Sequence, residues 1–243
     1  MLHLHGRRAV AGLTVTLLSG LALGGSALAQ DTAAPACPSG GNAVGGTPRP
    51  DVLSGTTADD RFTALAGDDN VSGLQGNDCV LGGDGFDTVS GGDGNDLMFG
   101  QDGPNDLAGG PGEDRAFGGA DFDFLSGGLG RDELNGEGGP DDISGGRDDD
   151  RIDGGEGVDF VSGGLGIDIV RGGEGDDEVS GGADGDRISG GPGDDLVTGG
   201  FGNDAMTGDA GDDELDGGPG RNTYLAGDAT TWSTPPTACG RRA

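Results

Sequence analysis

The chain has 243 residues and a formal net charge of -31 at pH 7. It contains 59 glycines, only 31% hydrophobic residues, and 13 basic residues that are all Arg. So acidic a chain excludes nucleic acid as a partner and attracts cations. Low hydrophobicity with high net charge is also typical of disorder, so an ordered fold must be argued from pattern.

Residues 1–29 have the features of a secretory signal peptide. His3, His5, Arg7 and Arg8 precede an apolar run that ends in the A-x-A cleavage site Ala27–Ala29. We expect export to an extracellular space where calcium is plentiful, and a mature chain with no membrane span. An uncleaved membrane anchor is the alternative.

Removal of this segment would leave a mature chain without histidine, because both histidines lie within it. That excludes a Ser-His-Asp triad, an H-E-x-x-H zinc motif and the commonest general base. The sequence therefore predicts a protein that is not an enzyme.

A nine-residue repeat fills most of the remaining chain. Twenty blocks run without insertion or deletion from block 1 (46–54) to block 20 (217–225). The first position is Gly in 19 blocks, the sixth is Asp in 18, and the eighth is apolar in all 20. A disordered linker has no reason to keep this register. We divide the chain into a signal peptide (1–29), an N-terminal linker or cap (30–45), the repeat region (46–225), and a tail (226–243) that either caps the last turn or is flexible.

Odd and even blocks differ, so the structural repeat is 18 residues. The ninth position is mostly Ser in odd blocks, whereas even blocks place residues such as Phe99, Asn135 and Arg171 there. Positions seven to nine alternate outward, inward and outward, which is typical of a short strand. The glycines of positions one to six permit the positive φ angles of tight turns. We expect two parallel sheets with the eighth column as a thin core between them.

The sixth-column Asp predicts a cation ladder along each edge. Stacked turns bring equivalent carboxylates, 18 residues apart, to about 4.8 Å from each other, where they repel unless a cation lies between them. Calcium accepts roughly 6–8 oxygen ligands in flexible geometry, and turn carbonyls provide more of them.

In this pattern, G-G-x-G-x-D-x-(apolar)-x, the chain resembles the RTX, or haemolysin-type, calcium-binding repeats. The resemblance implies an all-β fold, a right-handed parallel β-roll (β-solenoid) of 18 residues per turn and about ten turns, with multiple Ca2+ ions between turns. Carbonyls of turn glycines such as Gly157 and Gly175 would complete each site. The implied metal ligands are Asp60, Asp69, Asp78, Asp87, Asp96, Asp114, Asp123, Asp132, Asp141, Asp150, Asp159, Asp168, Asp177, Asp186, Asp195, Asp204 and Asp213.

Departures from the motif rank these sites. The strongest runs are expected at Asp78, Asp96, Asp114 and Asp132 on even turns and at Asp141, Asp159, Asp177, Asp195 and Asp213 on odd turns. Weak or empty sites are expected at Asn105, where GQDGPND indicates a slip of one residue, at the degenerate first block with Asp51, and where Asp121, Asp148 and Asp184 replace the fourth glycine.

Three cysteines remain to be placed. Cys79 lies at a seventh position, facing outward, and the linker from Cys37 is long enough to reach it, whereas Cys239 would lie about 45 Å away by strand spacing. We favour a Cys37–Cys79 disulfide as an N-terminal clamp. Three free or scrambled thiols are the alternative.

The partner is not identified by the sequence. Leu81, Leu97, Phe99 and Phe117 are expected to face outward together, either as a partner or self-association surface or as local packing. The function that fits best is a secreted calcium-binding protein that folds on calcium and has a structural, adhesive or envelope-associated role, with an unknown protein or cell-surface partner. The alternatives are an accessory module or carbohydrate-acting enzyme that uses surface carboxylates, and a calcium buffer.

Overall fold

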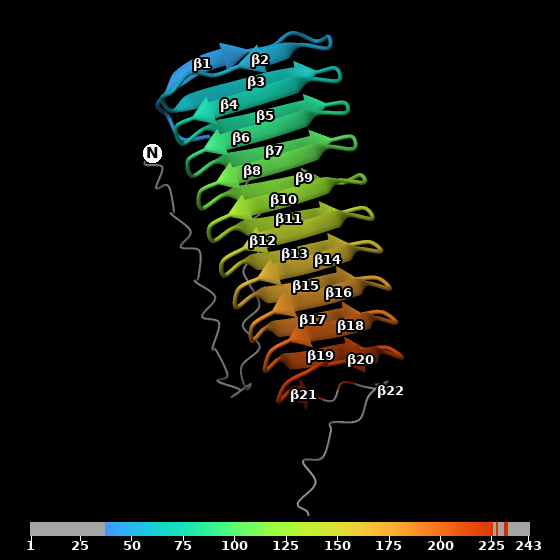
Figure 1. The fold of residues 1–243 in the computed structure, drawn as a ribbon. Helices are drawn as coiled ribbons and strands as arrows, with labels where there is room; N and C mark the ends of the chain where they lie inside the picture. The colour runs from blue at the N-terminus through green and yellow to red at the C-terminus, as the bar shows by residue number, and fades with distance from the viewer. Residues whose placement is uncertain (1–36, 226, 228–230, 233–243) are drawn as a thin grey trace, which may run out of the picture. The chain divides into compact units, whose positions relative to one another are not determined.

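The repeat region forms a two-sheet parallel solenoid (Figure 1). The computed structural model describes residues 37–225, 227 and 231–232, so the expected signal peptide lies outside the described residues. The chain alternates between two eleven-stranded sheets, so that strands of one sheet are two apart in sequence order. No helix within the described residues is long and apolar enough to cross a membrane.

The first sheet holds the odd-numbered strands. They are β1 (Asn42–Gly45), β3 (Asp60–Ala66), β5 (Cys79–Asp84), β7 (Leu97–Asp102), β9 (Arg115–Gly119), β11 (Glu133–Gly138), β13 (Arg151–Glu156), β15 (Ile169–Glu174), β17 (Arg187–Pro192), β19 (Ala205–Ala210) and β21 (Thr223–Leu225). Positions seven to nine of the even blocks lie in this sheet.

The second sheet holds the even-numbered strands and positions seven to nine of the odd blocks. They are β2 (Val52–Ser54), β4 (Asn70–Gln75), β6 (Thr88–Asp93), β8 (Asp106–Pro111), β10 (Phe124–Leu129), β12 (Asp142–Arg147), β14 (Phe160–Leu165), β16 (Glu178–Ala183), β18 (Leu196–Phe201), β20 (Glu214–Asp216) and β22 (Thr231–Trp232). We call the row of turns made by odd blocks the odd edge and the row made by even blocks the even edge.

The register confirms the 18-residue period. Val161 on β14 pairs with Val179 on β16, and each neighbouring pair from β1 to β21 keeps the same offset, whereas β22 in the tail pairs with β20 at an offset of 17. The described repeats form about ten turns, as predicted. The chain enters the ladder at Asn42, before the first block, because β1 already pairs with β3. In the tail, β22 pairs with β20.

The eighth column is the core, as predicted. Its side chains form one continuous buried cluster from Phe62 to Leu215, and even Val161, the most accessible of them, is only 3% exposed. One inward side chain per nine residues gives a narrow seam between the sheets. Val44, Leu53 and Tyr224 pack against it at the two ends.

The glycines have two separate roles, of which only one was predicted correctly. Second- and fourth-position glycines such as Gly164 and Gly166 have φ angles of 112° and 137°, which favour glycine. The first-position Gly163 is required for space instead, because an added Cβ would lie 2.5 Å from Oδ2 of Asp168 and 2.5 Å from the carbonyl oxygen of Gly181.

The predicted slip at GQDGPND is wrong. Gln101 pairs with Gly83 on one side and with Gly119 on the other, so the register passes through this turn unchanged. Gln101 takes a φ of 78°, which lets a non-glycine residue occupy the second position of the same turn. Asn105 therefore keeps its place in the odd ladder.

A disulfide joins Cys37 to Cys79, as favoured from the sequence. Cys79 is only 5% exposed although it lies at an outward position. Along the same sheet, Phe99 is 6% exposed and stacks on Phe117 with ring centroids 5.1 Å apart. Phe99 and Phe117 thus lie together, as expected, and the burial of Phe99 favours the alternative of local packing over a partner surface at this position.

Candidate metal centres along the aspartate ladders

Every predicted ligand lies in one of two buried ladders, one along each edge. The odd ladder contains Asp69, Asp87, Asp123, Asp141, Asp159, Asp177, Asp195 and Asp213, and the even ladder contains Asp60, Asp78, Asp96, Asp114, Asp132, Asp150, Asp168, Asp186 and Asp204. None of these side chains is more than 2% exposed. The solenoid thus places Asp159 and Asp177 in one ladder and Asp168 in the other, although Asp168 lies nearer in sequence to each of them than they do to each other.

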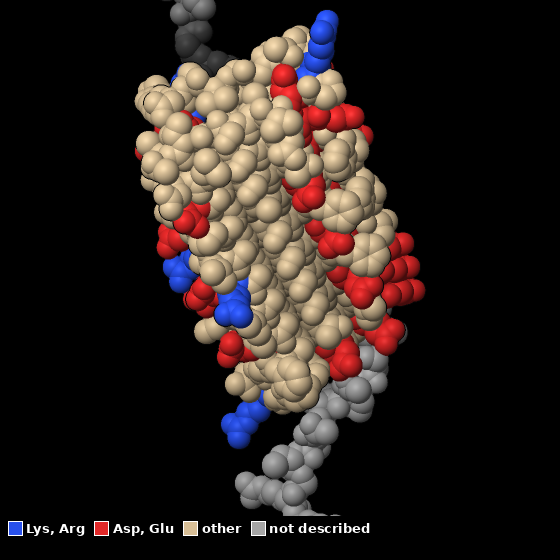
Figure 2. Space-filling view, turned by 45° about the horizontal axis from the view of Figure 1, so that its top comes forward, with Lys and Arg blue, Asp and Glu red and all other residues tan. Residues whose placement is uncertain are grey.

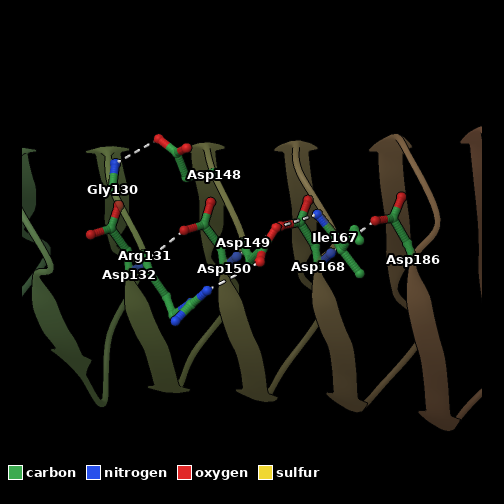
Figure 3. Close-up of polar contacts among 9 residues, drawn as sticks. All are labelled: Gly130, Arg131, Asp132, Asp148, Asp149, Asp150, Ile167, Asp168 and Asp186. Carbon is green, nitrogen blue, oxygen red and sulfur yellow. Dashed lines mark hydrogen bonds and ion pairs between the residues drawn. The ribbon is translucent and has the colours of Figure 1, made fainter.

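One oxygen of each carboxylate ties neighbouring turns together. Oδ1 of Asp168 accepts the backbone N–H of Asp150 at 2.8 Å, and Oδ1 of Asp186 accepts that of Asp168 at 2.9 Å (Figure 3). The odd ladder does the same, for example from Asp159 to Asp177 at 2.9 Å. These bonds fix the side-chain direction without neutralising the charge.

The second oxygen is buried and has no hydrogen-bond partner. This holds for Oδ2 of every ladder Asp from Asp69 to Asp204. It faces the first glycine of its own block, beside the first-position carbonyl of the next turn, as at Gly163 and Gly181. A carboxylate oxygen without a donor therefore lies near a backbone carbonyl oxygen, which is a second acceptor. A buried carboxylate oxygen in this position costs free energy unless a proton or a cation bridges the two acceptors.

The family comparison agrees with this geometry. The family model for the RTX calcium-binding nonapeptide repeat matches seven segments, of which the last five overlap, at residues 45–78, 80–107, 108–143, 135–170, 162–197, 171–206 and 189–224. The chain belongs to the RTX calcium-binding repeat family. A comparison with curated proteins gave no match.

RTX repeats bind multiple calcium ions, and the ladder oxygens fit a hard cation that prefers oxygen ligands. Within the described residues, however, no group of three or more His, Cys, Asp or Glu side chains gathers at one point to hold a metal. An ion between two turns must therefore take much of its coordination from backbone carbonyls. That requirement explains why glycine dominates the turns.

Burial raises the pKa values of the ladder carboxyls from Asp78 to Asp213, and like charges add to this at most of them. For Asp141, burial is the largest cause, and the neighbouring Asp123 and Asp159 add to it, so that its pKa rises to about 8 despite a backbone hydrogen bond. The same causes raise the pKa of Asp177 to about 7. Without metal, these groups resist ionisation near neutral pH.

Asn105 shows what the orphaned oxygen requires. It is fully buried, and its Oδ1 accepts the N–H of Asp87 at 3.2 Å, like its Asp counterparts. Its Nδ2 takes the place of the orphaned Oδ2 and donates to the carbonyl of Gly103 at 2.7 Å. The amide hydrogen lies between Nδ2 and the carbonyl oxygen of Gly103, whereas in an Asp block both of these atoms would be oxygen acceptors. The Asn105 side chain therefore has its hydrogen bonds satisfied without a metal ion, and it presents an N–H donor where a cation would need an oxygen ligand.

Besides the two sixth-column ladders, the turns contain a further row of stacked hydrogen bonds at the fifth position, which was not predicted from the sequence. Oδ1 of Asp176 accepts the N–H of Asp194 at 2.9 Å, and Asp194 does the same for Asp212 at 2.8 Å. This ladder runs in the opposite direction to the sixth-column ladder and is exposed. The frequent Asp and Asn residues in the fifth column were the signal for it.

Two fourth-position replacements also cap backbone groups. Oδ2 of Asp148 accepts the N–H of Gly130 at 3.3 Å, and Oδ2 of Asp121 accepts that of Gly103 at 2.9 Å (Figure 3 shows the former). Asp148 and Asp184 adopt φ angles of 73° and 79°, so the turn shape is kept without glycine. Whether calcium binds weakly beside them stays a prediction.

Proposed function

We propose that this RTX protein is a secreted, non-enzymatic solenoid that folds when calcium occupies its aspartate ladders, and that it serves a structural, adhesive or envelope-associated role. The observation that carries the proposal is the recurring buried carboxylate oxygen with no hydrogen-bond partner. The ligands we assign are the sixth-column Asp residues and backbone carbonyls of the glycine turns, such as those of Gly157 and Gly175, together with first-position carbonyls such as that of Gly181.

Electrostatic repulsion makes the metal-free fold costly. Two carboxylates about 4.8 Å apart repel by roughly 3.5 kcal/mol at an effective dielectric constant of about 20. If every ladder carboxylate were ionised, the repulsion summed along both ladders would exceed the net stability of about 5–15 kcal/mol that is typical of a domain, which is why groups such as Asp141 resist ionisation in the metal-free fold. Calcium binding converts the repulsion into attraction, so that binding free energy becomes folding free energy.

Secretion is supported by two features. Residues 1–29 resemble a signal peptide, and the Cys37–Cys79 disulfide is a bond that forms and persists in oxidising compartments. Millimolar calcium outside the cell would keep the ladders loaded, whereas low calcium inside it would keep the chain unfolded until export.

A non-catalytic role is supported by the chemistry of the surface. A groove of about 600 Å³ on the even edge is lined by repeat positions such as Glu113, Leu129, Arg131 and Asp149. Arg131 pairs with Asp149 at 3.1 Å, so these charges are already used in the fold. Neither histidine of the chain lies beyond residue 5.

Circular dichroism and small-angle X-ray scattering test the proposal. The mature chain should be expanded in chelator and should become compact and rich in β-structure as calcium is added, with a cooperative transition. Magnesium is the control, because it demands tighter octahedral geometry and holds its water. A chain with the same dichroism and radius in chelator and in calcium would refute the proposal.

A further inference from the structure

Charge is divided unequally between the odd and even blocks. From Gly55 to Leu225, all Arg residues belong to even blocks, and the odd blocks contain no basic residue at all. The even blocks match their Arg with acids outside the sixth column, as in the Arg115–Glu133 pair at 2.6 Å. Figure 2 shows Asp and Glu along both sides of the repeat region, with aromatic rings beside them on one side and most of the visible Arg among them on the other.

In the second sheet, the odd blocks, which contain no Arg from Gly55 onward, carry an alternating row of acidic and apolar side chains. In successive strands β8 to β16 the seventh position is Asp106, Phe124, Asp142, Phe160 and Glu178, each paired in register with the next. The alternation continues through Leu196 on β18 to Glu214 on β20. We call this row, from Asp106 to Glu214, the acid–apolar row.

Both kinds of side chain in the row are available to a partner. Phe124 is 44% exposed and Phe160 is 54% exposed, and every carboxylate of the row is exposed. Within the described residues, none of these carboxylates forms an ion pair or a side-chain hydrogen bond. Phe122 at the odd edge widens the apolar part, with its ring edge-on to that of Phe124 at 4.7 Å between centroids.

The fold alone does not require this row. Like charges directly opposite each other are destabilising, so acids on adjacent strands must be separated. The first sheet meets that requirement at the same position by placing Arg115 beside Glu133. In the second sheet exposed phenylalanines separate the acids instead, which leaves both the charge and the apolar surface without a partner.

We propose that the acid–apolar row is a docking surface for a basic amphipathic helix of another protein. Charge complementarity favours a cationic partner, because the odd blocks from Gly55 to Leu225 contain no Arg and no ion pair among the described residues joins Arg147, on β12 of the same sheet, to a carboxylate of the row. The strand spacing of about 4.8 Å approximates the 5.4 Å pitch of a helix, so successive turns of one helix face can present Lys or Arg and apolar residues alternately to neighbouring acids and to the Phe or Leu between them over a few consecutive strands. The row spans seven strands, or about 29 Å, which corresponds to roughly five helical turns.

A binding assay with the calcium-loaded full chain tests this proposal. The probe is a dye-labelled synthetic helix with Lys and Leu alternating on one face, followed by fluorescence anisotropy, and a helix with Glu in place of Lys is the peptide control. The double substitution Phe124→Ser and Phe160→Ser should weaken binding by about tenfold or more. The matched pair Leu165→Ser and Ile167→Ser, at exposed positions of even blocks, should change it by less than about twofold.

Three outcomes would overturn the proposal. Equal effects of the two double substitutions would mean that the acidic chain attracts the peptide without using the row. Phe124- and Phe160-dependent binding to anionic phosphatidylglycerol vesicles, without peptide binding, would assign the row to a membrane. A calcium-loaded dimer in light scattering that is lost on substituting both phenylalanines would assign it to a second copy. The proposal needs the calcium-folded chain, so dichroism of the same samples separates its failure from failure of the proposed function.

Discussion

Asn105 offers the sharpest test of how the ladders work, because a single substitution should create a calcium site. The variant Asn105→Asp replaces the amide that donates to Gly103 with a carboxylate oxygen that cannot. Losing that hydrogen bond costs about 1 kcal/mol. The new carboxylate also lies one strand spacing from Asp87 and from Asp123, which adds roughly 3.5 kcal/mol of repulsion with each in the absence of metal when both partners are ionised.

Calcium should reverse this penalty. With Asp at position 105 the odd ladder becomes continuous from Asp69 to Asp213, so the variant should bind at least one ion more than the parent chain. A site held at a free calcium concentration one hundred times its Kd contributes about 2.7 kcal/mol to stability. The variant should therefore be less stable than the parent at low calcium and should gain more stability from each increase in calcium.

The assay counts bound calcium by equilibrium dialysis and elemental analysis, together with thermal unfolding at several calcium concentrations. The reciprocal variant Asp159→Asn, in the longest run of intact odd blocks, is the matched control and should lose at least one ion. Equal stoichiometry in the parent, Asn105→Asp and Asp159→Asn chains would refute the assignment of the sixth-column oxygens as ligands.

The other predictions concern turns, protonation and the N-terminal clamp. Gly163→Ala should lower the free energy of unfolding of the calcium-loaded chain by about 3 kcal/mol or more, measured with denaturant. Gly138→Ala, whose Cβ would meet nothing closer than 3.9 Å, should change that free energy by less than about 0.5 kcal/mol. Equal effects of the two substitutions would contradict the role of the first glycine. Acid should stabilise the calcium-free chain, because the folded pKa of groups such as Asp141, about 8, lies above the ordinary Asp value of 3.8. That stabilisation is complete below the unfolded pKa and is lost as the pH rises through the folded pKa, so dichroism should show more β-structure at pH 4 than at pH 9, and the reverse order would be evidence against it. Replacing both Cys37 and Cys79 with Ser should lower stability by about 2–4 kcal/mol in calorimetry, and an unchanged melting temperature would show that the clamp is dispensable.

The sequence was sufficient for the architecture because one pattern determines almost all of it. An eighth column that is always apolar, as at Val161 and Val170, determines which side chains face inward. The different ninth positions of odd and even blocks, as at Ser162 and Arg171, reveal that two blocks make one turn. Strict spacing then determines the register, which is why the two ladders were predicted with every member in its correct row.

Other features depend on atomic positions that the residue types at each repeat position do not specify. The first glycine looks like the other turn glycines, yet Gly163 is required by the position of one Asp168 oxygen and not by its own φ angle. The irregular letters around Asn105 indicated a slip, whereas the backbone accepts Gln101 at a positive φ angle and keeps the register. The fifth-position ladder was hidden because only some turns use it.

The most direct test of the central claim is the position of the metal itself. A crystal structure of the calcium-loaded chain, with anomalous scattering to locate the ions, should show calcium between Asp159 and Asp177 on one edge and between Asp150 and Asp168 on the other, bound by Oδ2 and by backbone carbonyls of the adjoining turns. A folded solenoid whose Oδ2 atoms bind no calcium along either ladder would contradict the account.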